Sequence, residues 1–285
     1  MMKKIPAGVY GLNPLMFGGI NENTITVVIG APGAGKTTFA MNFLRRGLDM
    51  GEDAIFITLD EAPEQVAAEA VQMGWDSIQQ YLDEGSMIFV DASGKQFTNF
   101  IQRELGGFVA EWAGHRARIV IDPLTPVLWS VKERYEQREV VSYLLREARK
   151  VGTVLCTLEE HGVVGDLSGP ELVIPMYLAD NVIHLRYRSH ESPERREMKI
   201  IKCRSSQHSR YWHPYRIIKG AGIVIQHAAE EAAPAHKVKD FRGEVKRQMG
   251  RVPPDLLRRM NPKERDAMLQ TLDALSKEYS GEMDP

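Results

Sequence analysis

Residues 26–38 read Thr-Val-Val-Ile-Gly-Ala-Pro-Gly-Ala-Gly-Lys-Thr-Thr, and the rest of the chain is organised around them. The apolar run 25–29 predicts a buried strand, and the run 38–49 after the glycines predicts a helix. Between the two lies the pattern G-x-x-x-x-G-K-T, which begins at Gly30. A strand, a glycine-rich loop and a helix in this order predict a phosphate-binding loop.

The residue types in this loop have chemical reasons to be there. Glycines let backbone N–H groups turn toward phosphate oxygens, and the following helix directs its positive end to the same place. Lys36 supplies a cation for the β- and γ-phosphates, and Thr37 supplies a hydroxyl for Mg2+. The predicted phosphate-binding residues are Gly30, Ala31, Pro32, Gly33, Ala34, Gly35, Lys36, Thr37 and Thr38.

Three further carboxylates are candidates for the chemistry of ATP. Hydrolysis needs a second metal ligand and a base that orients water. Asp122 ends the apolar strand predicted over 118–122 and fits the metal role, because open α/β sheets bind ligands at their carboxyl edge. Asp60 and Glu61 follow the strand predicted over 54–59 and are the candidate bases. Without the phosphate loop, the same pair would be more typical of a solvated turn.

The order of predicted elements defines the fold class. In the first part of the chain strands alternate with helices, which indicates a parallel sheet. The strands predicted there are 25–29, 54–59, 87–90, 118–122 and 153–158. Later segments alternate in polarity and predict antiparallel strands at 179–188, 197–204, 216–218 and 222–226. The prediction is an α/β protein with a mostly parallel central sheet and antiparallel C-terminal strands.

Composition limits the class of protein and its surroundings. The chain has 285 residues, of which 43% are hydrophobic and 26% charged, and its net charge is −2, so no global basic field draws it to nucleic acid or membrane. No apolar stretch approaches the ~20 residues of a membrane helix, and Pro6 and Gly8 interrupt the run that would make a signal peptide. Cys156 and Cys203 have no cysteine neighbours at metal spacing, and Cys156 is predicted to be a buried thiol. A reducing, cytoplasmic compartment is expected.

Further motifs show that the chain resembles the KaiC-like ATPases of the RecA superfamily from Ile5 to about Ile225. These motifs are Gly8-Val-Tyr-Gly-Leu-Asn-Pro-Leu15 with Gly18-Gly-Ile20, the loop 30–37, Thr58-Leu-Asp-Glu-Ala-Pro-Glu-Gln65, Gly74-Trp-Asp76, Ile121-Asp122, Lys202-Cys-Arg-Ser-Ser-Gln-His208 and Gly222-Ile223. The resemblance implies a RecA-like core that binds ATP and Mg2+ and often assembles into rings, commonly hexamers. It also implies that Lys202 and Arg204 act on the γ-phosphate of a neighbouring subunit. Taken alone, both would be solvated charges on a strand face.

Two departures from the family bear on activity. The family usually has Glu-Glu where this chain has Asp60 and Glu61, and the first position is taken as the base. Asp is one methylene shorter, and a misplacement of ~1 Å can cost ~100-fold in rate, so we expect slow hydrolysis or a base at Glu61. KaiC itself is similar to a tandem of two such domains and phosphorylates itself on Ser or Thr before the aspartate that matches Asp180. Segment 175–179, Pro-Met-Tyr-Leu-Ala, has neither residue, so autophosphorylation is not expected.

Other polar residues near the predicted site keep open interpretations. Thr157 either senses the γ-phosphate or is a β-branched strand residue. The polar group 159–161 and the pair His208 and His213 lack three ligands at a convincing metal spacing, so both are predicted to be solvated loops.

The C-terminal part differs in composition from the rest. We predict an ATPase domain over 1–227, a linker over 228–235 and a small helical appendage over 236–285. Residues 237–265 hold ten Lys or Arg against four Asp or Glu, yet lack interleaved aromatic residues beyond Phe241. A solvated or partner-docking helix is therefore favoured over contact with nucleic acid.

Together these features predict a KaiC-like regulatory or signalling ATPase. It is expected to form a ring, hydrolyse Mg-ATP slowly and act through a protein partner that the sequence does not reveal. Two alternatives stay open: an ATP-binding switch with negligible turnover, and a recombinase paralogue that acts on DNA. The second requires the loop 159–169 and the basic tail to bind strands, and the acidic character of that loop argues against it.

Overall fold

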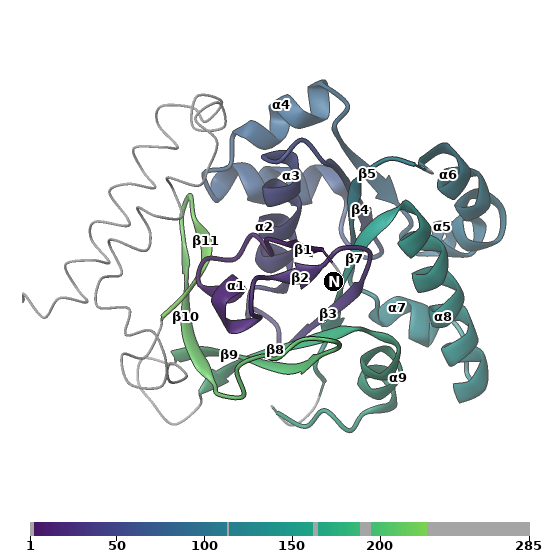
Figure 1. The fold of residues 1–285 in the computed structure, drawn as a ribbon. Coiled ribbons are helices and arrows are strands. Elements are labelled where there is room, and N and C mark those ends of the chain that lie inside the picture. Colours follow the sequence, from purple (N-terminus) through teal and green to yellow (C-terminus); the bar gives the residue numbers. More distant parts are fainter. Residues whose placement is uncertain (1–2, 113, 162–164, 189–194, 227–285) are drawn as a thin grey trace, which may run out of the picture.

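The computed structural model describes residues 3–112, 114–161, 165–188 and 195–226 (Figure 1). The predicted linker 228–235 and appendage 236–285 lie outside these residues. The strands are β1 (Lys4–Ile5), β2 (Ile20–Asn21), β3 (Ile25–Gly30), β4 (Asp53–Thr58), β5 (Met87–Asp91), β6 (Ala117–Asp122), β7 (Gly152–Glu159), β8 (Asn181–Arg188), β9 (Arg195–Cys203), β10 (His213–Ile218) and β11 (Gly222–Ile225). The helices are α1 (Leu12–Leu15), α2 (Lys36–Leu48), α3 (Pro63–Gln72), α4 (Ser77–Asp83), α5 (Lys95–Asn99), the π-helical turn η1 (Phe100–Glu104), α6 (Leu105–Trp112), α7 (Thr125–Trp129), α8 (Arg134–Val151) and α9 (Pro170–Leu178).

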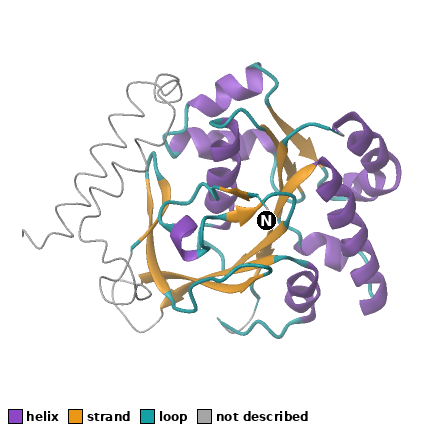
Figure 2. Ribbon diagram, viewed as in Figure 1, coloured by secondary structure: helices purple, strands orange, loops and turns teal. Residues whose placement is uncertain are grey.

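One large sheet dominates the described part of the chain (Figure 2). Its nine strands run in the order β11-β10-β9-β8-β3-β7-β6-β4-β5. From β8 to β5 every neighbouring pair is parallel, whereas β8 to β11 pair antiparallel. The predicted fold class is confirmed. The phosphate-loop strand β3 lies between β8 and β7, so strands that follow it by more than 120 residues in the chain flank it on both sides.

Apolar side chains cover both faces of the sheet. Val28 belongs to a core that α2 completes with Phe39 and Phe43, while Val27 and Ile29 belong to the core on the other face, under α8. Burial on both faces explains why β3 is a continuous apolar run rather than an alternating one. The sheet curls, so that α2 contacts β6 on one side and β11 on the other (Figure 1).

Two helices show how local sequence signals can mislead. The helix α2 begins at Lys36, before the predicted Thr38, because Gly35 with φ 92° turns the chain directly into the first helical turn. The helix α9 was not predicted. Pro170 occupies its first turn, where proline is favourable, but Pro175 lies inside it, and proline within a helix is normally a sign against one.

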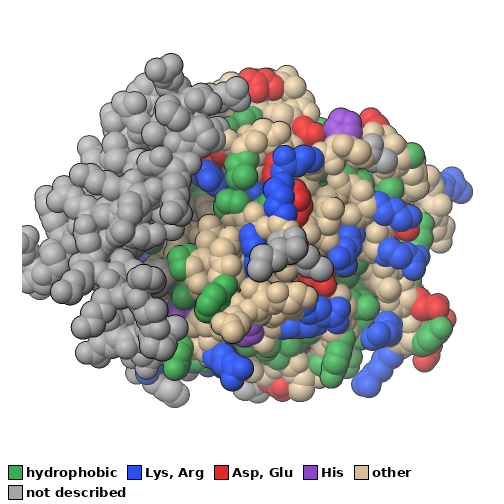
Figure 3. Space-filling view, in the orientation of Figure 1, with side chains coloured by type: hydrophobic (Ala, Val, Ile, Leu, Met, Phe, Trp, Pro, Cys, Tyr) green, Lys and Arg blue, Asp and Glu red, His purple; other side chains and the backbone are tan. Residues whose placement is uncertain are grey.

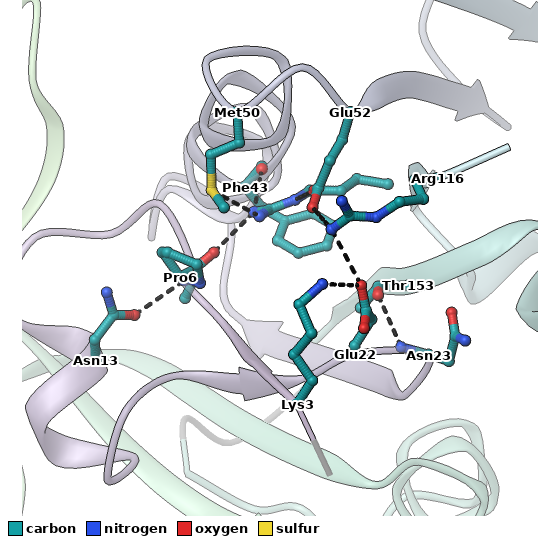
Figure 4. A network of polar contacts seen from close by, with 12 residues as sticks. Lys3, Pro6, Asn13, Glu22, Asn23, Phe43, Met50, Glu52, Arg116 and Thr153 are labelled. Atoms are coloured by element: carbon teal, nitrogen blue, oxygen red, sulfur yellow. Dashed lines mark hydrogen bonds and ion pairs between the residues drawn. The ribbon is translucent and has the colours of Figure 1, made fainter. Parts of the chain in front are cut away.

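A buried ion pair fastens the N-terminal segment to the sheet (Figure 4). Arg118 in β6 has no solvent exposure, and its Nε donates to Glu52 Oε2 at 2.6 Å. Its Nη1 donates to the carbonyl oxygens of Pro6 at 2.8 Å and of Phe43 at 3.0 Å. Gly47 of α2 lies against the same side chain, since a Cβ there would be 2.6 Å from Arg118 Cδ. One guanidinium thus joins the N-terminal segment, α2 and the turn before β4.

Surface charge agrees with the near-neutral composition. On the face shown in Figure 3, Lys and Arg side chains lie scattered among neutral and acidic ones rather than in one continuous patch. No helix in the described ranges is long and apolar enough to cross a membrane.

Candidate nucleotide-binding site

The loop between β3 and α2 has the backbone that its glycines predict. Gly33 and Gly35 have φ values of 74° and 92°, in the left-handed region that favours glycine. A Cβ on Gly33 would also lie 2.9 Å from the Tyr187 hydroxyl. These two positions therefore need glycine for both conformation and space.

Two tyrosines from distant strands hold the loop from outside. The Tyr187 hydroxyl of β8 donates to the carbonyl oxygen of Gly33 at 2.6 Å, and the Tyr215 hydroxyl of β10 donates to that of Ala34 at 2.5 Å. These bonds fix the orientation of two peptide units of the loop. The sequence analysis missed both tyrosines, because they are separated from their partners by 154 and 181 positions and no local pattern marks them.

Lys36 begins α2 at the end of the loop, and its side chain reaches back to the start of the loop. Its Nζ donates to the carbonyl oxygens of Gly30 at 3.0 Å and Ala31 at 3.3 Å. Burial lowers the pKa of Lys36, and the carboxylates of Glu159 and Asp122 oppose that shift. The lysine is thus a partly desolvated cation. Desolvation strengthens its attraction for an anion, whereas the neighbouring carboxylates weaken that attraction.

Asp122 at the end of β6 is the buried carboxylate of the site. Burial raises its pKa, while hydrogen bonds from the Thr157 and Thr37 hydroxyls and the charge of Lys36 lower it. The Thr157 hydroxyl donates to Asp122 Oδ1. The fold therefore brings Lys36, Thr37 and Asp122 together as predicted, and Thr157, whose interpretation was open, contacts the aspartate.

The two candidate bases lie at the same edge of the sheet. Thr58 pairs with Asp122 in the register of β4 and β6, so the residues after β4 emerge beside Asp122. Asp60 and Glu61 are both exposed there. The Thr58 hydroxyl donates to the backbone oxygen of Glu61 at 2.5 Å and fixes the turn. Partial burial raises the pKa of Glu61, with smaller contributions from nearby carboxylates that include Asp122.

Lys202 and Arg204 lie at the opposite edge. Lys202 pairs with Val182 at the start of β8, whereas Gly30 pairs with Leu185 further along the same strand. The Lys202 Nζ donates to three carbonyl oxygens at the end of α9, the closest at 2.6 Å. Arg204 also donates to α9 at 3.3 Å. The structure does not bring these cations to the phosphate loop of the same chain.

Some polar residues have places that the sequence analysis did not foresee. Glu160 was predicted to be part of a solvated loop, and this was wrong, because its carboxylate is buried against His184 of β8. His161 is 46% exposed, as expected, and stacks on Trp129. Cys156 is buried and unpaired, which confirms its prediction, and burial raises its pKa.

The donors around Asp122 suit a magnesium ion that is shared with a nucleotide. Within the described ranges, no group of three or more His, Cys, Asp or Glu side chains forms a metal cage. Mg2+ in nucleotide sites takes one or two protein oxygens together with phosphate oxygens and water. Asp122 and the hydroxyl of Thr37, which bonds to it, supply that kind of donor set.

A RecA-like sheet with a phosphate loop at its carboxyl edge defines a P-loop nucleotide-binding protein. A family model for the ATPase KaiC matches residues 5–230, and the chain therefore belongs to this family. The predicted resemblance is confirmed, and with it ATP binding as the property that the family shares.

Individual relatives agree with this assignment. The chain is 31% identical over 233 residues to the circadian clock protein KaiC3 of Synechocystis sp., covering 79% of this chain and 46% of that protein. It is 27% identical to a UPF0273 protein of Pyrococcus furiosus, covering 79% and 94%. The crystal structure of a KaiC-like protein from Pyrococcus horikoshii superposes with a TM-score of 0.66 at 28% identity, covering 80% and 100%. The chain thus spans about half the length of the clock protein that it matches.

Proposed function

We propose that this protein is a Mg-ATP-dependent regulatory ATPase that works as a ring of identical subunits with slow turnover. The supporting observation is the separation of its charged groups. Lys36, Thr37 and Asp122 meet at the carboxyl edge of the sheet, whereas Lys202 and Arg204 lie at the other edge. A site that needs all five groups is completed only when a second subunit brings its cations to the first.

In the proposed reaction each residue has one task. The backbone of the phosphate loop and Lys36 bind and orient the phosphates, and Asp122 with Thr37 would hold Mg2+, which neutralises charge on the β- and γ-phosphates. Asp60 or Glu61 orients the attacking water. Arg204 of the neighbouring subunit stabilises the charge of the transition state, a contribution of ~10³–10⁵ in rate in related enzymes.

Subunit mixing tests the shared site. Lys36→Ala subunits lack the cation of the phosphate loop. Arg204→Ala subunits lack the cation that would reach the site of a neighbouring subunit, so each variant alone is expected to be nearly inactive. Mixed rings should regain part of the ATPase rate, because some interfaces pair an intact loop with an intact arginine. Native mass spectrometry serves as the control that mixed rings form. No recovery in mixed rings, or full activity in a monomer, would contradict the proposal.

The identity of the base is decided by a pair of variants. If Asp60 orients the water, Asp60→Glu restores the longer side chain that the family usually has at this position and raises the ATPase rate. Glu61→Gln then keeps appreciable ATPase activity. If Glu61→Gln abolishes turnover and Asp60→Glu changes nothing, Glu61 is the base.

A second candidate is an ATP-binding switch with negligible turnover. The exposed, shorter side chain of Asp60 favours it, because a base without fixed position orients water poorly. In this case ATP binding would change the affinity for a protein partner without release of phosphate. Buried free thiols at Cys156 and Cys203 are compatible with a reducing cytoplasm, where we place either form.

A further inference from the structure

An acid and a base that the proposed reaction does not use are buried beside the nucleotide site. His184 in β8 and Glu160, directly after β7, have side chains that are 2% and 1% exposed. His184 Nε2 lies 3.2 Å from Glu160 Oε2. Burial of an ionisable pair is costly, so a pair kept at such a place needs a compensating role or good partners.

Glu160, directly after β7, contacts both the start of the phosphate loop and Gly165. Its backbone N–H donates to the carbonyl oxygen of Gly30 at 3.1 Å. The same oxygen accepts a hydrogen bond from Lys36 Nζ. The Glu160 carboxylate accepts one from the backbone N–H of Gly165, in the loop that follows β7. Movement of Glu160 would therefore displace the start of the phosphate loop and break the hydrogen bond from Gly165.

A stack of side chains covers His184. The Trp212 ring meets the imidazole edge-on with 5.4 Å between ring centres, and the Arg186 guanidinium lies 3.5 Å from the centre of the Trp212 ring. Lys199 Nζ lies 5.7 Å from the same ring. The charged groups that face His184 are thus Glu160, Arg186 and Lys199. Burial, with help from the two cations, lowers the pKa of His184 against the opposing effect of Glu160. With a proton on Nε2, the imidazole donates to the Glu160 carboxylate.

From this geometry we propose that His184 is a positioning residue of the nucleotide site. Its imidazole holds the Glu160 carboxylate, and Glu160 in turn fixes the Gly30 carbonyl and the Gly165 amide. The pair sets the distance between Gly30 of the phosphate loop and Gly165. This inference rests on the proposed nucleotide site, but its first test needs no nucleotide.

Two substitutions in the full-length protein separate positioning from packing. His184→Gln keeps a nitrogen donor at a similar reach, whereas His184→Leu keeps volume without a donor. A double variant, His184→Leu with Glu160→Leu, removes the unpaired carboxylate as well. Thr153→Val is the matched control, because Thr153 is equally buried but lies at the other end of β7, where it accepts from Asn23 N–H.

Amide hydrogen exchange at Glu160 and Gly165, without nucleotide, is the first readout. We expect exchange at least ~10-fold faster in His184→Leu and in the double variant, and near wild type in His184→Gln and Thr153→Val. The second readout is affinity for a fluorescent ADP, which should weaken about tenfold in His184→Leu, equal to ~1.4 kcal/mol of binding free energy. The double variant should regain thermal stability but not affinity.

Three outcomes would overturn the inference. The first is a wild-type rate of amide exchange in His184→Leu, and the second is an equally accelerated exchange in Thr153→Val. The third is recovery of both thermal stability and ADP affinity in the double variant, which would mean that the pair contributes only packing. If the wild-type protein bound no nucleotide while the exchange results held, the proposed function would fail and the positioning of the loop would stand.

Discussion

The buried guanidinium of Arg118 offers a test of how the fold is held. Replacement by Met keeps most of the side-chain volume but removes the hydrogen bonds to Glu52, Pro6 and Phe43. Breaking a buried ion pair costs ~3–5 kcal/mol, and each buried carbonyl without a donor costs a further ~1–3 kcal/mol. Arg116 offsets part of this loss, because its Nη2 stays 3.1 Å from Glu52 Oε1 (Figure 4). The low ends of these costs add to about 5 kcal/mol, and the Arg116 contact offsets up to about 1 kcal/mol, so we expect Arg118→Met to lower the free energy of unfolding by about 4 kcal/mol.

Urea unfolding followed by circular dichroism measures this difference, and the melting temperature should fall by about 10 °C. Arg116→Met is the matched control: its side chain is 59% exposed, and exposed ion pairs contribute ~0–1 kcal/mol. Adding Glu52→Gln to Arg118→Met should recover about 2 kcal/mol, because the buried charge is then gone. If Arg118→Met costs no more than Arg116→Met, the buried pair does not anchor the N-terminal segment as we argue.

Three other predictions concern different parts of the chain. Gly47→Ala should lower the melting temperature, because the new Cβ would clash with the Arg118 side chain, even though Ala favours a helix over Gly by ~1 kcal/mol. Gly107→Ala is the control: the space around Gly107 is open, so this change should raise the melting temperature. Lys36→Ala should weaken binding of a fluorescent ATP ~10–100-fold in a titration while the melting curve stays unchanged, and equal affinity would refute the role of the lysine. Folding lowers the pKa of His184 below its ordinary value of 6.5. The contribution of the neutral imidazole to the free energy of unfolding is therefore fully present above pH 6.5 and is lost as the pH falls below it. Wild-type stability should therefore fall more steeply than that of His184→Gln as the pH drops below 6.5, and parallel profiles would contradict this.

The sequence predicts the parts of the site whose residues lie close together in the chain. The phosphate loop has a fixed spacing of glycines before Lys36, and Asp122 ends an apolar strand, so local patterns and sheet geometry suffice for both. The place of Arg204 relative to the loop was not derivable in this way. Its expected role came from the family resemblance, and the strand register now shows that it lies at the opposite edge of the sheet.

The missed contacts share a physical cause. Tyr187 and Tyr215 reach the phosphate loop only because the late strands join the sheet beside β3. Glu160 looked solvated because its neighbours in sequence are polar, but its partner His184 comes from the next strand but one in the sheet. Such pairs depend on strand order, which a single sequence does not encode in any local window.

The tyrosine bonds to the phosphate loop also affect how a nucleotide would exchange. Fixing one residue of backbone costs ~1–2 kcal/mol of conformational entropy. Because Tyr187 and Tyr215 already hold Gly33 and Ala34 in the free protein, this entropy is lost when the chain folds. Nucleotide binding then does not include the same loss. The loop would keep its shape when a nucleotide dissociates, so the next nucleotide would bind to a preorganised loop. Contacts with the nucleotide itself, rather than refolding of the loop, would then set the rate of exchange.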